Sequence, residues 1–238
     1  MIKNKKTNNR KKIMICLSGG QDSATVLAWA IKNFDVVETV SFSYNQRHDV
    51  ELEHAKKLSN IANVNHTILH VNTLKEIGNS ALLNKVEKIK KGTNNLPTSF
   101  VPGRNLIFSL YASALAYKKG FKHIGLGVCE MDYSGYPDCR DETIKSMEET
   151  IKKGFNYDIH IHTPLMWLTK SKIIKLMKKL NKIKWYKYTH TCYNPNKEGI
   201  SCGECPACKI RIKGFKEAGY IDPIKYQIKI DWGDCKRI

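Results

Sequence analysis

One stretch near the N-terminus, residues 13–31, constrains the fold of this chain more than any other. The apolar run 13–17 ends abruptly at residues 18–20, which read Ser-Gly-Gly, and a helix-forming run follows directly. This pattern predicts a buried strand, a tight turn and the first turn of a helix. Glycines let the backbone approach an anion closely, and the N–H groups of a turn and a helix start can bind phosphate. We therefore expect a phosphate site at this junction.

The turn is specific because it reads Ser-Gly-Gly-Gln-Asp-Ser in full. Asp22 is placed either to cap the helix or to hold a Mg²⁺ ion that bridges phosphates. A Walker loop is excluded, since that loop needs Gly-x-x-x-x-Gly-Lys. The turn instead resembles the pyrophosphate loop (PP-loop) of the ATP pyrophosphatases, which cleave ATP between its α and β phosphates to adenylate a substrate. The resemblance implies that ATP is bound by Ser18, Gly19, Gly20, Gln21, Asp22 and Ser23.

Strands and helices alternate along the next part of the chain. Further strands are predicted at 36–44, 66–71, 122–129 and 159–161, and helices at 49–62, 105–119, 141–153 and 170–180. The alternation predicts an α/β fold with a doubly wound, mostly parallel, Rossmann-like sheet and right-handed crossovers. Ligands bind at the carboxyl edge of such sheets, which is where the phosphate turn lies. Residues 80–96 break the pattern and predict an exposed loop.

Composition and length bound the domain organisation. A chain of 238 residues suits one large α/β domain with a small appendage. We expect a flexible basic tail at 1–12, an α/β domain at 13–182 and a zinc-binding region at 183–238. The N-terminus has no apolar core typical of a secretory signal, and no apolar run approaches the ~20 residues of a membrane span. We therefore expect a cytoplasmic protein without a membrane partner.

The formal net charge of +18 raises the question of a nucleic-acid partner. Only six of the 40 basic residues are arginines, and the lysines are spread along the whole chain. Nucleic-acid sites usually cluster their basic residues and use arginine where bases are read. We therefore expect no direct contact with nucleic acid.

Polar residues at strand ends and helix starts are candidates for substrate binding. Gln46, Arg47 and His48 follow the second strand, at the same edge as the phosphate turn, where they can reach an adenine or a second substrate. A surface position is the alternative for His48. Arg104 precedes a helix and can meet a phosphate or carboxylate with its guanidinium fork. The same stretch also reads as a capping loop, with Asn105 as the cap.

Lys170 lies at a predicted helix start, where its ammonium group is a compact counter-charge for phosphate. Because lysine is abundant throughout this chain, the position of Lys170 alone is weak support for a role.

The least generic stretch is 127–140, which places carboxylates and an arginine among tyrosines after a strand. Aromatic rings beside carboxylates suit a flat heteroaromatic ligand with N–H donors. Asp138 is the first choice for reading such a ring edge, because Pro137 fixes the chain just before it, and Asp132 is the second. The substrate-binding candidates of this stretch are Asp132, Tyr133, Ser134, Asp138 and Arg140.

Four cysteines near the C-terminus have the spacing of a metal site. Cys192, Cys202, Cys205 and Cys208 form the pattern Cys-x₉-Cys-x₂-Cys-x₂-Cys, which is typical of tetrahedral Zn²⁺. Four protein ligands leave no open position, so the metal is expected to be structural. An iron–sulfur cluster is the alternative. A disulfide framework is not expected, since no secretory signal is present.

These motifs occur together, and in the same order, in one family. The chain resembles the 7-cyano-7-deazaguanine synthases of the queuosine precursor pathway over about residues 13–220. The shared parts are the pyrophosphate loop, residues 46–48, 100–105, 132–140 and 163–170, and the four-cysteine knuckle. The loop alone would indicate only the superfamily, whereas the Ser-Gly-Tyr-Pro-Asp-Cys-Arg run together with the knuckle indicates this family.

The resemblance implies an ATP-dependent carbon–nitrogen ligase. The carboxylate of 7-carboxy-7-deazaguanine would attack the α-phosphate of ATP, and ammonia would displace AMP to give an amide. A second ATP would activate the amide oxygen, and loss of AMP would leave the nitrile. The implied catalytic residues are Ser18, Asp22, Arg104 and Lys170. Mg²⁺ with the ATP, one structural Zn²⁺ per chain and a homodimer are implied as well.

Two other functions remain open at this point. A tRNA-modifying PP-loop enzyme of the sulfurtransferase type would need a tRNA-binding appendage or a redox-active cysteine pair, and neither is evident in the sequence. A non-catalytic zinc module that binds nucleic acid would not need the intact phosphate turn.

Overall fold

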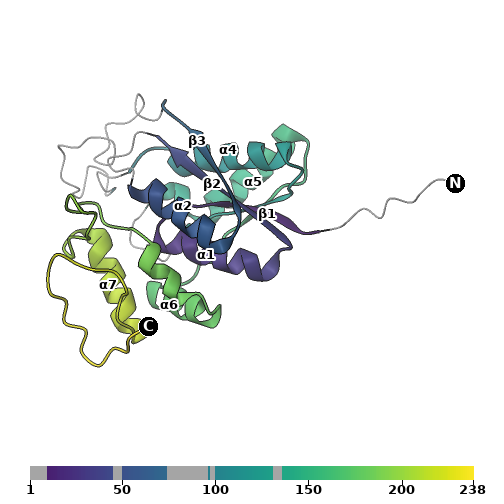
Figure 1. The fold of residues 1–238 in the computed structure, drawn as a ribbon. Helices are drawn as coiled ribbons and strands as arrows, with labels where there is room; N and C mark the ends of the chain where they lie inside the picture. Colours follow the sequence, from purple (N-terminus) through teal and green to yellow (C-terminus); the bar gives the residue numbers. More distant parts are fainter. Residues whose placement is uncertain (1–9, 45–49, 74–95, 97–99, 131–135) are drawn as a thin grey trace.

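The described residues form a five-stranded parallel sheet at the centre of the molecule (Figure 1). The computed structural model describes residues 10–44, 50–73, 96, 100–130 and 136–238. The strands are β1 (Lys12–Cys16), β2 (Val36–Ser43), β3 (Asn65–His70), β4 (His123–Gly125) and β5 (His160–His162). Their order is β3-β2-β1-β4-β5, with every neighbouring pair parallel. The predicted doubly wound α/β fold is confirmed, with the order reversing between β1 and β4.

Helices cover both faces of the sheet because β1 alternates its side chains between them. Ile13 and Ile15 pack on the face that carries α1 (Gln21–Asn33) and α2 (Val50–Ala62). Met14 packs on the face that carries α4 (Arg104–Lys118) and α5 (Asp141–Phe155). All three side chains are fully buried. A parallel strand covered on both faces is apolar along its whole length, which explains the uninterrupted apolar run of β1.

The C-terminal part of the chain packs against the α1 face. It contains α6 (Lys170–Lys179), a 3₁₀ segment (Ile183–Tyr188) that the sequence did not predict, and α7 (Pro206–Ala218); α6 and α7 lie side by side (Figure 1). The rings of Tyr186 and Phe215 meet edge to face at 5.6 Å within the cluster that contains Ile13. One apolar cluster therefore spans the domain boundary expected at residue 182, and that boundary stays a prediction.

Two helix starts differ from the sequence expectation. Asp22 does not cap α1, since the N-cap is Gly20 and Asp22 lies in the first turn. Asn105 does not cap α4, because the N-cap is Gly103 with φ at 72°, a conformation that suits glycine. Glycine at both caps leaves the side chains of Asp22 and Asn105 available for other contacts.

Strand β4 is shorter than the predicted strand 122–129. It ends at Gly125, and the chain then passes the start of α1 so closely that a Cβ at Gly127 would lie 2.9 Å from the backbone nitrogen of Ser23. Residues 126–129 consequently line a cavity instead of extending the sheet. No helix in the described part of the chain is both long and apolar enough to cross a membrane.

Candidate active site

A cavity of about 370 Å³ lies at the carboxyl ends of β1, β2 and β4. Its wall contains the turn after β1, the end of β2, the segment after β4 and residues from the first turns of α1, α2, α4 and α6. Small-molecule sites commonly have volumes of about 300–1,000 Å³ and lie where the strand order of an α/β sheet reverses. The cavity therefore occupies the sheet edge at which the sequence predicts ligand binding.

Gly19 lets the phosphate turn lie directly against α2. Its φ is +83°, and a Cβ there would come 2.2 Å from the carbonyl oxygen of Glu51 and 3.0 Å from the backbone nitrogen of Ala55. Any other residue would push α2 away from the turn. The first glycine of the motif thus has a packing reason as well as a conformational one.

Two serine hydroxyls hold the turn together. The Ser18 hydroxyl lies 3.0 Å from the Ser23 hydroxyl and accepts the N–H of Gly20 at 3.3 Å. The Ser23 hydroxyl accepts the N–H of Ser18 at 3.2 Å and donates to the carbonyl of Gly20 at 3.1 Å. The turn is therefore organised by its own side chains, so an incoming phosphate meets donors that are already in place.

Asp22 and Lys170 meet in the cavity wall although they lie far apart in the sequence. The Lys170 ammonium nitrogen is 2.5 Å from Asp22 Oδ2, and their side chains are 14% and 23% exposed. Lys170 is the first residue of α6, whose N-cap Thr169 accepts the N–H of Lys172. On α7, a Cβ at Gly214 would lie 2.6 Å from Lys170 Cβ. Close packing of α6 and α7 thus positions Lys170 beside the phosphate turn.

Three polar atoms of cavity-lining residues are buried without a hydrogen-bond partner in the described part of the chain. They are Gln21 Nε2, Asp22 Oδ1 and Thr191 Oγ1. An unsatisfied buried polar atom costs about 1–3 kcal/mol, so native proteins keep few of them. Such atoms in a cavity indicate positions where a ligand or ion completes the site, and a carboxylate oxygen such as Asp22 Oδ1 suits a cation.

Arg104, the first residue of α4, contributes a permanent positive charge to the cavity wall. Its guanidinium carbon lies 5.9 Å from the centre of the Tyr136 ring. Burial acts to lower the pKa of Arg104, but the neighbouring Tyr44, Tyr136 and carboxylates act in the other direction, and the pKa lies above its ordinary value. Arg104 therefore stays cationic, as its predicted contact with a phosphate or carboxylate requires.

Aromatic side chains form flat parts of the cavity wall. The rings of Phe42 and Phe108 stack with their centres 4.3 Å apart and their planes 4° from parallel. Tyr136 and Tyr193 also line the cavity. Flat apolar surfaces beside a cation suit a planar ligand that carries an anionic group.

Asp138 and Arg140 lie outside the cavity wall, although Asp138 is close to the start of α4. Asp138 is 5% exposed, and its Oδ2 accepts the N–H of Asn105 at 2.9 Å. The Arg140 side chain is 51% exposed and lies 3.7 Å from a Glu142 carboxylate oxygen. Neither belongs to the cavity wall. Contact of Asp138 with a ligand ring stays a prediction, and its carboxylate already has a partner at the N-terminus of α4.

Six predicted residues lie outside the described residues: Gln46, Arg47, His48, Asp132, Tyr133 and Ser134. Their assignment to substrate binding stays a prediction. The predicted loop at 80–96 lies outside the described residues as well, except for residue 96.

Sequence reasoning missed several residues of the cavity wall, among them Glu51, His190, Thr191 and Tyr193. The backbone N–H of His190 donates to the carbonyl of Gly19 at 2.9 Å, which ties the C-terminal segment to the phosphate turn. The usable signals were an acidic residue three positions after the polar run 46–48 and a Thr-His-Thr run directly before the first metal-spaced cysteine.

The four cysteines predicted to bind a metal come together at the start of α7. Their sulfur atoms all lie within 4.8 Å of one another. Backbone N–H groups point at the sulfurs: Cys192 Sγ accepts from Cys202 at 3.2 Å, Cys202 Sγ from Cys205 at 3.3 Å, and Cys205 Sγ from Cys208 at 3.5 Å. N–H donors stabilise thiolates, the form that binds metal. The cluster therefore fits a tetrahedral metal ion.

A comparison with protein-family models identifies the family to which the chain belongs. The model described as "Queuosine biosynthesis protein QueC" matches residues 12–219. The chain belongs to the QueC family. The QueC match includes the phosphate turn, Glu51, Lys170 and all four cysteines, so the parts that build the cavity and the cysteine cluster lie within the family region.

Curated relatives match the chain over nearly its full length. A protein of Chromobacterium violaceum named 7-cyano-7-deazaguanine synthase is 43% identical over 219 residues, which are 90% of this chain and 93% of the relative. A protein of Bacillus subtilis with the same name is 47% identical over 212 residues, which are 87% of this chain and 95% of the relative.

The fold is also similar to solved structures. A 4-thiouridine synthetase, solved in complex with RNA and with bound ATP, matches with a TM-score of 0.52 and 17% sequence identity. The match covers 87% of this chain and 50% of that one. A likeness at this identity supports the α/β fold and nothing further.

Proposed function

We propose that this chain is a 7-cyano-7-deazaguanine synthase, an ATP-dependent carbon–nitrogen ligase that acts on 7-carboxy-7-deazaguanine and ammonia. The observation that carries the proposal is the match to the QueC family over residues 12–219, with curated relatives of that name at 43% and 47% identity. The cavity adds independent support, because it combines a phosphate turn, two cations and aromatic walls.

The reaction proceeds through two adenylated intermediates. The substrate carboxylate attacks the α-phosphorus of ATP and pyrophosphate departs; ammonia then adds to the acyl carbon and AMP leaves, which gives the amide. The amide oxygen attacks a second ATP in the same way. Loss of AMP and of the remaining nitrogen-bound protons then gives the nitrile. Catalysis rests mainly on positioning and charge stabilisation.

The phosphate turn and Lys170 serve the departing pyrophosphate. The turn offers backbone N–H groups and the hydroxyls of Ser18 and Ser23, and Lys170 brings a positive charge to the same wall. Asp22 would hold Mg²⁺ through Oδ1, the buried oxygen that has no hydrogen-bond partner among the described residues, and the ion would supply further positive charge beside the phosphates. Gln21 Nε2, which also lacks a hydrogen-bond partner within the described part of the chain, is a second group available to the nucleotide.

The aromatic wall and Arg104 serve the deazaguanine. Tyr136 and Tyr193 offer ring faces against which a planar ring can stack. The guanidinium group of Arg104 can bind the carboxylate of the deazaguanine or the α-phosphate of ATP. A bound carboxylate must be turned toward the phosphate turn to react, and Arg104 lies in the same wall as that turn. The residues 46–48 and 132–134 are proposed to complete the substrate site.

The cysteine cluster is proposed to hold one Zn²⁺ as a structural ion. All four donors are sulfurs, which suits Zn²⁺, and four protein ligands leave no position for a substrate. The ion therefore contributes to the stability of the region around α7 and to no chemical step. We also propose a cytoplasmic homodimer; size-exclusion chromatography with light scattering tests the oligomeric state.

The proposal is tested by incubating the protein with ATP, Mg²⁺, ammonium and 7-carboxy-7-deazaguanine. We expect release of AMP and pyrophosphate together with a nitrile product detected by mass spectrometry. The matched control is 7-deazaguanine, which lacks the reacting carboxylate and should release neither. Release of AMP with bulk tRNA, and none with the deazaguanine acid, would overturn the proposal in favour of a tRNA-modifying enzyme.

A further inference from the structure

We propose that Glu51 is the general base that removes protons from the nitrogen atom during amide and nitrile formation. This inference rests on the proposed function and names a residue for the proton transfers of that reaction.

Glu51 lies in the first turn of α2, at the point where this helix touches the phosphate turn. Its carbonyl oxygen is the atom that a Cβ at Gly19 would strike, so the backbone position of Glu51 is fixed against the turn. Glu51 and Leu52 line the cavity, whereas Glu53 is exposed to solvent. The two acidic residues of this helical turn therefore have different surroundings.

The groups around Glu51 come from three other parts of the chain. Arg104 from α4 favours the ionised carboxylate, and Tyr44 after β2 and Tyr193 near the cysteine cluster interact with it electrostatically. The desolvation of the carboxyl outweighs the attraction of Arg104, and the pKa of Glu51 is raised to about 7. A base with a pKa near the working pH is the most effective proton acceptor that can also release the proton again.

The other titratable groups of the described cavity wall are poorly suited to this role. Asp22 already pairs with Lys170. His190 has its Nε2 3.0 Å from the carbonyl of Cys192, so this nitrogen carries a proton and is not available to accept one. Burial raises the pKa of Cys16 to about 12, so its thiol stays neutral. Glu51 is the carboxyl of the described wall that can gain and lose a proton near neutral pH.

The proton balance defines what Glu51 does. When ammonia attacks the acyl adenylate, a C–N bond forms, the C–O bond to AMP breaks with its electron pair leaving on AMP, and one N–H proton passes to the Glu51 carboxylate. In the nitrile step, the C–O bond to the second AMP breaks while the nitrogen gives up its remaining protons. Glu51 passes each proton to water. Formation of the acyl adenylate involves no N–H proton and needs no base.

The test separates the two half-reactions in Glu51→Gln, with Glu53→Gln as the matched control from the same helical turn. Acyl-adenylate formation is measured as exchange of pyrophosphate into ATP with the deazaguanine acid and no ammonium. We expect exchange within about threefold of the wild type, and amide formation lowered by about 10²–10⁴-fold, the usual contribution of general-base catalysis. Glu53→Gln should leave both rates unchanged.

The pH dependence distinguishes a base from a structural residue. With rates normalised to the concentration of free ammonia, wild-type amide formation should fall as the pH drops below about 7. The residual rate of amide formation in Glu51→Gln should not show this fall at low pH. Glu51→Asp should restore the fall in part. If Glu51→Gln forms the amide at the wild-type rate, or loses both half-reactions equally, the inference about Glu51 is overturned and the proposed function is not. A wild-type protein without deazaguanine-dependent exchange would overturn the proposed function and this inference with it.

Discussion

At the residue scale, Asp22 links the phosphate turn to the rest of the cavity wall. One of its oxygens pairs with Lys170 and the other is buried without a partner in the described part of the chain. We predict that Asp22→Ala lowers pyrophosphate release by at least about 10²-fold, because the site loses the carboxylate that would bind a metal cation. The fold should survive, since an acidic residue in a first helical turn contributes only about 0.3–1 kcal/mol to the helix.

The control for this prediction is Asp141→Ala. Asp141 lies in the first turn of α5 and pairs with Lys145 at 2.6 Å, so it has the same local context without a place in the cavity. It should keep full turnover. Near-normal pyrophosphate release from Asp22→Ala would remove Asp22 from the site.

Glu51 should also make stability depend on pH. Its pKa is about 7 in the folded chain, above the ordinary carboxyl value of 4.5, so the fold favours the protonated form. The resulting stabilisation is complete below about pH 4.5 and is lost as the pH rises through about 7. We predict that Glu51→Gln raises the melting temperature more at pH 8 than at pH 5. Glu53→Gln should show no such difference; an equal shift of Glu51→Gln at both pH values would contradict the raised pKa.

The sequence allowed some of these residues to be predicted and not others. The phosphate turn was predictable because its chemistry requires particular residues at a local strand–helix junction. The contact of Asp22 with Lys170 was not, since it depends on how α6 and α7 pack. Glu51 was missed because its environment is created largely by Arg104 and Tyr193, which are remote from it in sequence.

At the element scale, the N-terminus of α4 is held by a carboxylate from another segment. Asp138 accepts the N–H of Asn105, beside the residue that supplies the guanidinium to the cavity. We predict that Asp138→Ala loses about 1.5–3 kcal/mol of stability, the usual contribution of a hydrogen bond to a charged group. Thermal unfolding measures the loss. Unchanged stability together with a selective rise in the KM for the deazaguanine acid would instead support the direct ring contact expected from the sequence.

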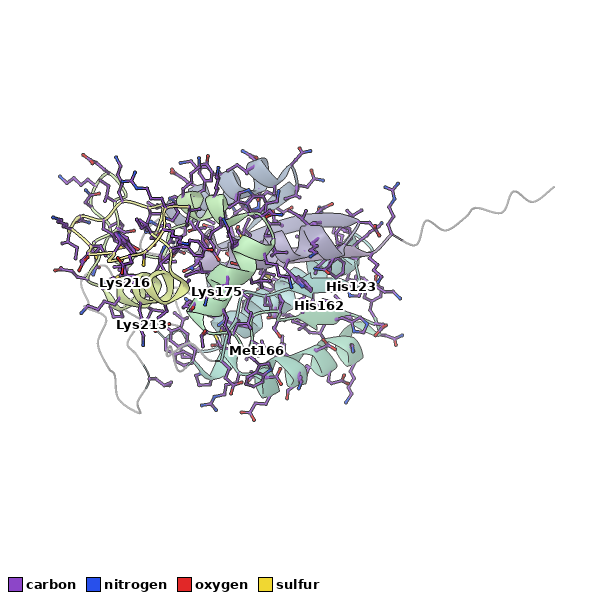
Figure 2. All side chains as sticks on the ribbon, turned by 90° about the horizontal axis from the view of Figure 1, so that it is seen from below. His123, His162, Met166, Lys175, Lys213 and Lys216 are labelled. Atoms are coloured by element: carbon purple, nitrogen blue, oxygen red, sulfur yellow. The ribbon has the colours of Figure 1, made fainter. Side chains whose placement is uncertain are left out.

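Strands β4 and β5 carry a pair of histidines away from the cysteine end of the molecule. Figure 2 shows His123 and His162 beside one another, far from Lys213 and Lys216 of α7. Their ring nitrogens, His123 Nδ1 and His162 Nε2, are 3.1 Å apart. Burial and then the neighbouring histidines lower the pKa of His162 to about 4. The folded chain therefore binds this proton less readily than the unfolded chain does.

This pair predicts a loss of stability in acid. The contribution of neutral His162 is complete above about pH 6.5 and is lost as the pH falls toward about 4. His162→Gln should therefore show a smaller drop in melting temperature between pH 7 and pH 5 than the wild type. His70→Gln, at an exposed position on the opposite edge strand, is the control and should follow the wild type. A wild-type-like drop in His162→Gln would contradict the lowered pKa.

Element types were predictable where periodicity is strong, and element ends were not. The apolar stripe gave α2 to within one residue, because a helix packed on one face repeats its pattern over several turns. The end of β4 depends on how closely Gly127 passes the start of α1. No local pattern encodes that approach.

At the scale of the whole molecule, the cysteine cluster anchors the region that positions Lys170. The cluster lies at the start of α7, and Gly214 of that helix packs against Lys170. Arg211 of α7 is 1% exposed and makes hydrogen bonds of 2.6 and 2.9 Å to both oxygens of Asp222. The position of α7 is thus fixed by the four-cysteine cluster at its start and by the buried ion pair of Arg211 along its length.

We predict one zinc ion per chain by elemental analysis. Because metal-binding free energy is also folding free energy, Cys205→Ser should lower the melting temperature and, by loosening α7 against Lys170, lower turnover as well. Cys235→Ser is the control, since this cysteine lies outside the cluster. Stoichiometric iron with sulfide, or full stability after removal of the metal by a chelator, would contradict the structural zinc site.

The measurement that tests the central claim most directly is a reaction with ¹⁵N-labelled ammonium in which nitrile and AMP are quantified together. The proposed function predicts that the nitrogen of the nitrile comes from ammonium and that two AMP are released for each nitrile formed. It also predicts a transient amide that carries the same label. The proposed function would be contradicted if the amide accumulated as the final product with one AMP released for each amide formed. It would also be contradicted if 7-carboxy-7-deazaguanine were not consumed at all.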